Sequence, residues 1–197
     1  MAERFGALAL LTLLLPFLLL AGAIVVVLSR RCPLVSHRRV GRHGRELWVL
    51  KLRTMWGPAV TYRSKRLFIE PVVDDGEPKL KRSSDPRVSS RFAAFCRKYS
   101  IDELPQLWHV VCGRMSLVGP RPLTSQELSR HYGSDTPRLL AVKPGLTGLW
   151  QVKGRSSLTR EERRRLDLHM IEHWSIKLYW DVLQATVPTV LSGRNAW

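Results

Sequence analysis

The sequence predicts a mixed α/β fold, an α+β arrangement richer in helix than in strand, that follows an N-terminal membrane helix. Residues 7–28 form one apolar run, four later segments carry signals of a helix, and only residues 46–55 alternate clearly between apolar and polar side chains. No GxGxxG or P-loop motif is present, so a doubly wound nucleotide-binding fold is not expected. The expected division is an anchor at residues 1–30 and one domain at residues 31–197.

The apolar run is long enough to cross a bilayer, since residues 7–28 would reach roughly 33 Å as a helix. Only Thr12, Pro16 and Gly22 interrupt it. Pro16 at its middle predicts a kink, because proline removes a backbone hydrogen bond and clashes with the preceding turn. A signal peptide is the alternative, but its apolar region is usually shorter, and no clear cleavage site precedes Arg30.

Basic residues flank the run on both sides. Arg4 precedes it, and no acidic residue lies between Glu3 and Glu46. The arginines that follow it are Arg30, Arg31, Arg38, Arg39, Arg42 and Arg45. Positive charge at both ends favours the cytoplasmic face, so we expect a re-entrant helix, with a single span as the alternative. The arginines are expected to lie against anionic lipid headgroups.

The elements of the domain are expected in the following order. Residues 46–55 form a strand, 74–86 a loop, and 89–99 a helix. A second helix runs from about 100 to 112 and ends at Gly113, and Gly/Pro turns follow at 118–122 and 143–148. Two helices, 160–174 and 174–191, complete the chain. The last is amphipathic and carries Trp and Tyr near its start, which suits the membrane interface.

Composition limits the class of function. The chain has 197 residues, 32 Lys and Arg against 16 Asp and Glu, and a formal net charge of +16. Such charge indicates an anionic partner: nucleic acid, a phosphorylated substrate or acidic lipid. The 45% hydrophobic content and seven Trp exclude a disordered tail. Three scattered Cys without a CxxC pair favour reduced thiols over disulfides or structural zinc.

Two adjacent carboxylates, Asp102 and Glu103, stand at the start of a predicted helix. Ser100 and Glu103 have the spacing of a capping box, so simple capping is one interpretation. The other is catalytic, because a helix start can also hold a phosphoryl group. One carboxylate would then act as a nucleophile and the other would bind a divalent cation.

Two arginines lie in stiff loops that suit phosphate binding. Arg121 follows Gly119-Pro120, and Arg155 follows Gly154 in a second Gly-rich segment. The planar guanidinium fork matches phosphate oxygens, although an Arg in a turn is more often a solvated surface charge.

Taken together, these motifs resemble the bacterial sugar transferases, the monotopic phosphoglycosyl transferases that start glycan assembly on polyprenyl phosphate. The resemblance covers nearly the whole chain, in a minimal form of the family. The matching motifs, in order, are LKLRTM (50–55), DPR (85–87), IDELPQL (101–107), MSLVGPRP (115–122) and the KPGLTG–QV–GR stretch (143–155).

The resemblance implies an activity and a set of roles. A sugar-1-phosphate would pass from a UDP-sugar to polyprenyl (undecaprenyl-type) phosphate with release of UMP, at the cytoplasmic face of the bacterial inner membrane. This is the first membrane step of glycan assembly (exopolysaccharide, O-antigen, capsule or glycoprotein). Asp102 matches the nucleophile that carries a covalent phospho-sugar, and Glu103 its neighbour, so Asp102 and Glu103 are the expected Mg²⁺ ligands. The substrate-binding positions implied are Arg53, Arg97, Arg121, Arg155 and Asp167.

The sequence departs from the family pattern at several positions. Arg114 replaces an acid, His109 an asparagine and Trp150 an alanine, and the start of the anchor is reduced to residues 3–6, ERFG. These changes bear on the donor sugar and on loop support. The identity of the sugar and a homodimeric state are left open by the sequence.

Two rival interpretations have a different chemistry. His169, Glu172 and His173 match the HxxEH pattern of some zinc proteases, although no third ligand is evident. A membrane-tethered nucleic-acid-binding protein would also explain the positive charge, but no recognition motif supports it, and no nucleic-acid partner is expected.

Overall fold

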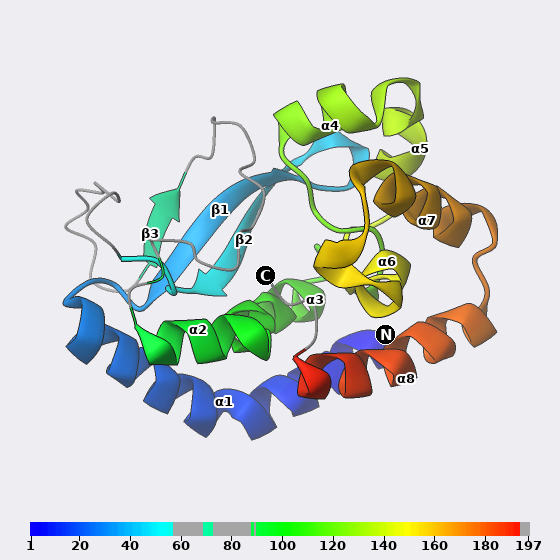
Figure 1. The fold of residues 1–197 in the computed structure, drawn as a ribbon. Coiled ribbons are helices and arrows are strands. Elements are labelled where there is room, and N and C mark those ends of the chain that lie inside the picture. Colours follow the sequence, from blue (N-terminus) through cyan, green and yellow to red (C-terminus); the bar gives the residue numbers. More distant parts are fainter. Residues whose placement is uncertain (57–68, 73–87, 89, 194–197) are drawn as a thin grey trace.

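Figure 1 shows the computed structural model, which describes residues 1–56, 69–72, 88 and 90–193. The predicted loop at 74–86 and the DPR motif lie outside the described residues. The strands are β1 (Leu34–Val40), β2 (Glu46–Leu52), β3 (Ile69–Val72), β4 (Ser116–Val118) and β5 (Gly145–Thr147). The α-helices are α1 (Ala2–Ser29), α2 (Arg91–Lys98), α3 (Leu107–Val111), α4 (Ser125–His131), α5 (Thr136–Leu140), α6 (Leu149–Lys153), α7 (Arg160–Glu172) and α8 (Ile176–Ser192). Short 3-10 turns are η1 (Arg42–Gly44), η2 (Ile101–Gln106), η3 (Gly133–Asp135) and η4 (Arg155–Ser157). The fold is therefore mixed α/β and helix-rich, as the sequence predicts.

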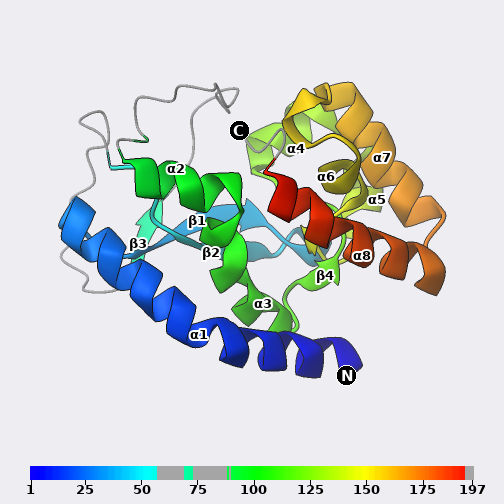
Figure 2. The same cartoon turned by 60° about the horizontal axis from the view of Figure 1, so that its bottom comes forward.

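Helix α1 runs without interruption through the apolar segment, and Pro16 lies at its middle. Figure 2 shows that its axis changes direction about half way along, which agrees with the predicted kink. Its buried residues are Ala7, Ala21 and Val25, whereas most of its leucines are exposed. Small side chains on one side let the helix approach the domain closely. The remaining surface is apolar, and the helix is long enough to cross a membrane.

A second layer of helix lies on the inner side of α1 (Figure 1). Ala7 packs in one buried cluster with residues of β2 and α3, among them Val49, Leu107 and Val110. Farther along α1, Ala21 and Val25 pack in a second cluster with residues that include Cys96 of α2 and Ile101 of η2. The predicted helix at 100–112 begins as the 3-10 turn η2 and continues as α3.

The main sheet has the order β2-β1-β3. β1 and β2 are antiparallel, with Leu34 opposite Leu52 and Val40 opposite Glu46, and β3 is parallel to β1. The central strand β1 was not expected, because its sequence LVSHRRV was interpreted as a basic flank of the anchor. Pairing with β2 on one edge and β3 on the other holds this polar segment in the sheet.

The β1–β2 hairpin carries several of the flanking arginines away from α1. Its tip lies beside α5, where Arg42 Nε donates to the carbonyl oxygen of Ala141 at 2.9 Å (Figure 1). Only Arg30 and Arg31 lie at the end of α1. The strand carries the hairpin tip away from α1 by about 3.3 Å per residue. Contact of all six arginines with lipid headgroups stays a prediction.

The second sheet consists of two short parallel strands, β4 and β5, at the positions that the sequence marked as Gly/Pro turns. Its backbones approach closely where Gly119 faces Gly145, so that a Cβ on Gly145 would overlap the backbone nitrogen of Gly119. Gly119 N donates to Thr147 O at 2.9 Å, and Gly145 N donates to Pro120 O at 2.8 Å. The glycines therefore allow the two loops to lock together.

The remaining helices cover this second sheet. Val118, Leu149, Met170 and Val182 form a buried cluster that joins β4 to α6, α7 and α8. Helices α7 and α8 agree with the predicted segments 160–174 and 174–191, whereas α4, α5 and α6 were not expected. Helices α1 and α8 lie along the same face of the molecule in both views (Figures 1 and 2).

We expect buried His109 to make the stability of this fold sensitive to acid. Its Nε2 accepts a hydrogen bond from Leu50 N of the edge strand β2 at 3.1 Å, so the ring is neutral. Burial, with a smaller contribution from Arg114, lowers the pKa of His109. The unfolded chain then binds the proton at His109 more tightly than the folded protein does. The stabilisation by neutral His109 is therefore present above the ordinary pKa of about 6.5 and is lost as the pH falls. Thermal unfolding in detergent at several pH values should show this loss.

His109→Asn is the comparison variant, because its side chain does not titrate in this range. Asp167, with a pKa raised to about 7, acts in the opposite sense: its contribution is lost as the pH rises. Both proteins contain Asp167, so its effect cancels when the unfolding temperatures of wild type and His109→Asn are subtracted at each pH. Parallel pH profiles of the two proteins would show that His109 is not the acid-sensitive group.

Candidate active site

The carboxylate pair lies at the start of η2, between β2 and the first turn of the inner helical layer. Asp102 is buried, with 8% of its surface exposed, and Glu103 is half-buried. The residue before η2, Ser100, is not a glycine yet has a left-handed backbone at φ 54°. This sharp entry directs two consecutive carboxylates into the domain, and such backbone strain is common at functional sites.

The capping interpretation of this pair is wrong. The Ser100 side chain makes no cap hydrogen bond, and its Oγ instead accepts from Arg155 Nη2 at 2.6 Å. Capping boxes do form at Thr124 and at Thr159, each with the Glu three residues later. The Glu103 carboxylate is therefore available for other partners.

Two cations share one oxygen of Glu103. Its Oε1 accepts from Lys51 Nζ at 2.7 Å and from Arg121 Nη2 at 3.0 Å. The Glu103 charge is the main cause that raises the pKa of Arg121, with a smaller contribution from Asp102. These three side chains come from β2, η2 and the loop after β4. The carboxylate thus joins three separate parts of the fold.

Arg155 is a third cation near the pair. Like Ser100 it has a left-handed backbone, at φ 52°. It bonds to Ser100 and also donates to Thr189 O of α8 at 3.5 Å. Burial is the main cause that lowers the pKa of Arg155, while Glu103 and Asp102 act to raise it. The electrostatic influence of both carboxylates reaches this guanidinium.

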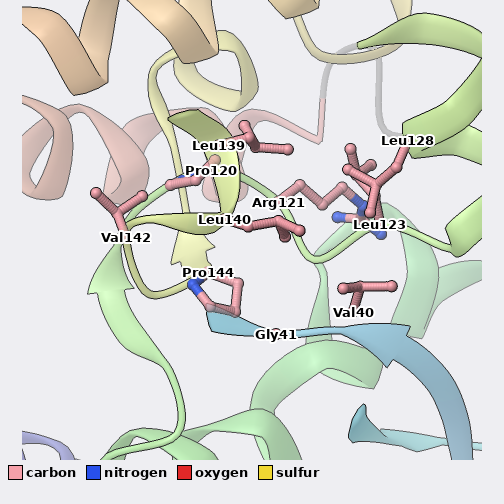
Figure 3. Close-up of a pocket in the computed structure, with 10 residues that line it drawn as sticks. All are labelled: Val40, Gly41, Pro120, Arg121, Leu123, Leu128, Leu139, Leu140, Val142 and Pro144. Carbon is pink, nitrogen blue, oxygen red and sulfur yellow. The ribbon is translucent and has the colours of Figure 1, made fainter. Parts of the chain in front are cut away.

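The loop that carries Arg121 is held from its other side by apolar packing. Figure 3 shows Arg121 at a small pocket whose other lining side chains are aliphatic or proline, with the backbone of Gly41. They come from the end of β1, from α4 and α5, and from the loop itself. This lining does not suit a diphosphate, which needs several polar partners. Its effect is to fix the backbone from which the guanidinium extends.

Asp167 lies apart from the pair, on α7. One carboxylate oxygen accepts from Tyr132 Oη at 2.7 Å, and the other, Oδ1, is buried with no hydrogen-bond partner among the described residues. Burial raises its pKa to about 7, against the lowering effect of Tyr132, Arg121 and Arg163. Asp167 is therefore linked electrostatically to Arg121 but does not contact Asp102 or Glu103.

Among the described residues, the structure shows no hydrogen bond or ion pair from Arg53 or Arg97 to the carboxylate pair. Arg53 is 2% exposed, forms a buried ion pair with Glu70 of β3, and donates to Cys32 O at 2.7 Å. Arg97 lies in the last turn of α2, and no hydrogen bond or ion pair of its side chain is found among the described residues. Their family-implied phosphate roles stay predictions, and Arg53 serves the packing of the sheet in this structure.

Sequence reasoning missed two basic residues. Lys51 shares the inward face of β2 with buried Leu47 and Val49, so the alternation that predicted the strand also marked a half-buried lysine. Arg163 lies over the Trp150 ring at 4.7 Å, and its buried Nε has no hydrogen-bond partner among the described residues. No sequence signal distinguished it from its neighbours in the RRR run.

The zinc interpretation is not supported. His169 and His173 stack on each other at 4.2 Å, and Glu172 pairs with Arg138. Within the described parts of the chain, no group of three His, Cys, Asp or Glu side chains could hold a metal ion. Asp102 and Glu103 supply two carboxylates, which fits Mg²⁺, because this ion is commonly held by one or two carboxylates together with substrate phosphates.

Comparison with known proteins identifies the family of this chain. The family model for bacterial sugar transferases matches residues 1–193.

The chain belongs to the bacterial sugar transferase family.

Several curated relatives are similar to this sugar transferase. A UDP-galactose-lipid carrier transferase from Erwinia amylovora is 40% identical over 198 residues, which cover 99% of this chain and 40% of the relative. An undecaprenyl-phosphate galactose phosphotransferase from Salmonella typhimurium is 39% identical over 82% of this chain and 34% of the relative. The exopolysaccharide production protein ExoY from Rhizobium meliloti is 35% identical over 95% of this chain and 82% of the relative. The chain thus spans less than half of the first two relatives and most of the third.

We expect the Arg53–Glu70 pair to act on stability. Glu70→Leu should destabilise the protein by about 3–5 kcal/mol, because it leaves a buried guanidinium without its counter-charge. The double variant Arg53→Met/Glu70→Leu should recover most of this loss, since apolar residues of similar size can replace a buried ion pair. Denaturant unfolding of the four proteins in the cycle measures both effects. Recovery of stability without recovery of activity would show that Arg53 also binds substrate.

Proposed function

We propose that this chain transfers a sugar-1-phosphate from a UDP-sugar to undecaprenyl-type polyprenyl phosphate and releases UMP. The observation that carries the proposal is the buried Asp102–Glu103 pair, placed among Lys51, Arg121 and Arg155 in a member of this family. The names of the relatives, which refer to a lipid carrier and to undecaprenyl phosphate, support the substrates. The name of the ExoY relative, which refers to exopolysaccharide production, supports a place in that pathway.

The reaction has two displacement steps. In the first, a carboxylate oxygen of Asp102 attacks the phosphorus that bears the sugar. The bond from that phosphorus to the bridging oxygen breaks, and UMP leaves with the bond electrons. In the second, an oxygen of polyprenyl phosphate attacks the same phosphorus and releases Asp102. The covalent intermediate divides one difficult transfer into two steps.

The cations around the pair reduce the charge repulsion between the nucleophile and the diphosphate substrate. An anionic nucleophile must approach an anionic diphosphate, so charge repulsion opposes the first step. Arg121 and Lys51 lie within hydrogen-bond distance of Glu103, beside the nucleophile. Preorganised positive groups stabilise the charge that develops on the leaving phosphate. Mg²⁺, held by Asp102 and Glu103, supplies further charge neutralisation when bound.

The membrane face supports a lipid-linked acceptor. Exposed apolar residues of α8 recur along one side of the helix, at Ile176, Trp180, Val187 and Leu191. Helix α1 lies along the same face of the molecule, and its bend suits a re-entrant anchor with both ends on the cytoplasmic side (Figure 2). A domain that lies at the membrane interface through these two helices would hold its carboxylate pair within reach of a polyprenyl headgroup. Arg30 and Arg31 suit contact with anionic lipids.

We expect Asp102→Asn to lower turnover by several powers of ten, because it keeps the shape of the side chain and removes the nucleophilic oxygen. The wild-type protein given a UDP-sugar without acceptor should carry a phospho-sugar. Intact-mass spectrometry with peptide mapping locates the group. A modification on another residue, or full activity of Asp102→Asn, would contradict the assignment.

The matched control is Glu103→Gln, which alters the neighbouring carboxylate. It should retain a measurable intermediate but respond more weakly to added Mg²⁺. Undiminished activity in EDTA would argue against the magnesium role while leaving the Asp102 assignment intact.

We expect Pro16→Leu to convert the anchor into a full span, because it restores the helix bond that the kink removes. Ala2→Cys, probed in intact cells with a membrane-impermeant thiol reagent, reports the side on which the chain begins. Protection in the parent and labelling after Pro16→Leu support the re-entrant anchor. Permeabilised cells and a chain without the added cysteine are the controls, and strong labelling of the parent would show a simple span.

A further inference from the structure

We propose that Glu3 is a positioning residue that clamps the first turn of α1 to the catalytic domain and thereby holds the anchor re-entrant. The proposal rests on the proposed function for the side of the membrane on which the domain lies. In the sequence, Glu3 is the single acid before the apolar run and the first residue of the reduced anchor start, ERFG, and no role was assigned to it.

Three donors converge on one oxygen of Glu3. Its Oε1 accepts from Ser116 Oγ at 2.6 Å, from Leu117 N at 2.6 Å and from Tyr179 Oη at 3.0 Å. Ser116 and Leu117 belong to β4 and Tyr179 to α8, so the clamp joins three elements that are distant in sequence. A carboxylate that accepts several hydrogen bonds forms stronger contacts than a neutral acceptor would.

The surroundings of the clamp support a built contact. Burial and the Glu3 charge raise the pKa of Tyr179, so its hydroxyl stays protonated and remains a donor. One turn later, Ala7 is fully buried against α3 and β2. The Arg4 guanidinium lies against Gly113, which ends the α3 segment with φ at +72°. The start of α1 is thus held by polar contacts at Glu3 and by packing at Ala7.

The clamp and a membrane-spanning α1 exclude each other. Ser116, Leu117 and Tyr179 all belong to the part of the chain that follows α1. A straight 28-residue helix would extend about 42 Å, so a full span would place Glu3 on the opposite side of the bilayer from these donors. Each hydrogen bond at Glu3 therefore favours the re-entrant arrangement over the span.

The clamp also reaches the site through β4. Strand β4 pairs with β5 and continues directly into Gly119, Pro120 and Arg121. Arg121 in turn donates to Glu103. Release of Glu3 removes a support from the strand that carries Arg121, so it should lower kcat as well as change the topology.

The decisive variants remove the donors and leave the Glu3 charge in place. Ser116→Ala/Tyr179→Phe deletes two of the three hydrogen bonds. Ser129→Ala/Tyr99→Phe is the matched control, because it deletes the same atoms from α4 and from the end of α2. Each pair is combined with Ala2→Cys in the full chain and probed in intact cells with a membrane-impermeant maleimide.

We expect labelling of the thiol introduced by Ala2→Cys to rise by about tenfold in Ser116→Ala/Tyr179→Phe and to stay at the parent level in the control, because loss of a hydrogen bond to a charged group shifts an equilibrium by about that factor. Glu3→Gln, which keeps an acceptor oxygen, should be labelled less than Glu3→Ala. The purified donor-side variant in lipid nanodiscs should show a lower kcat than the control.

Unchanged labelling in Ser116→Ala/Tyr179→Phe would overturn the proposal, since it would show that the hydrogen bonds at Glu3 do not hold the N-terminus on its side of the membrane. The phospho-sugar intermediate of the parent, measured in the same preparation, tests the proposed function separately. A parent without that intermediate would contradict the enzyme assignment, whereas the labelling result would still decide the clamp.

Discussion

The Glu103 carboxylate is the interaction on which the arrangement of the site depends. A pair of adjacent carboxylates cannot be buried without nearby positive charge, because removal of an ion from water is costly unless it is paired. Here the compensation comes from Lys51 of β2 and Arg121 of the loop after β4, which meet at one oxygen of Glu103. The main sheet, the inner helical layer and the second sheet are therefore held together at the residue next to Asp102.

The anchor imposes a second constraint. The carboxyl end of α1 leads directly into β1, and its first turn contacts β4 and α8 through Glu3. A helix tied to one domain at both ends must lie along that domain, and Pro16 at its middle gives it the bend to do so (Figure 2). The exposed side of α1 and the apolar side of α8 then form one apolar face, which suits the insoluble polyprenyl substrate proposed above.

Charge in this protein serves three different purposes, and only position separates them. Arg53 is buried beside Glu70 and supports the sheet, although it lies only two residues beyond Lys51 in the chain. Arg42 closes the hairpin on α5, far from the anchor. Arg121 and Arg155 flank the carboxylate pair. The net charge of +16 agrees with the anionic substrates proposed above, but it did not distinguish these arginines.

The sequence by itself determined the class of fold, the long apolar helix α1 and the helices α7 and α8, and it singled out the adjacent Asp102 and Glu103, because each depends on local periodicity, length or adjacent residues. It did not reveal β1, β4, β5 or the short helices α4, α5 and α6, whose segments are too short or too polar for a periodic signal. Only the tertiary structure decided that Ser100 binds Arg155 rather than capping a helix, that Lys51 rather than Arg53 reaches Glu103, and that Glu3 meets Ser116 and Tyr179. These contacts join residues distant in sequence, and the choice among similar side chains depends on which backbone brings a partner within about 3 Å.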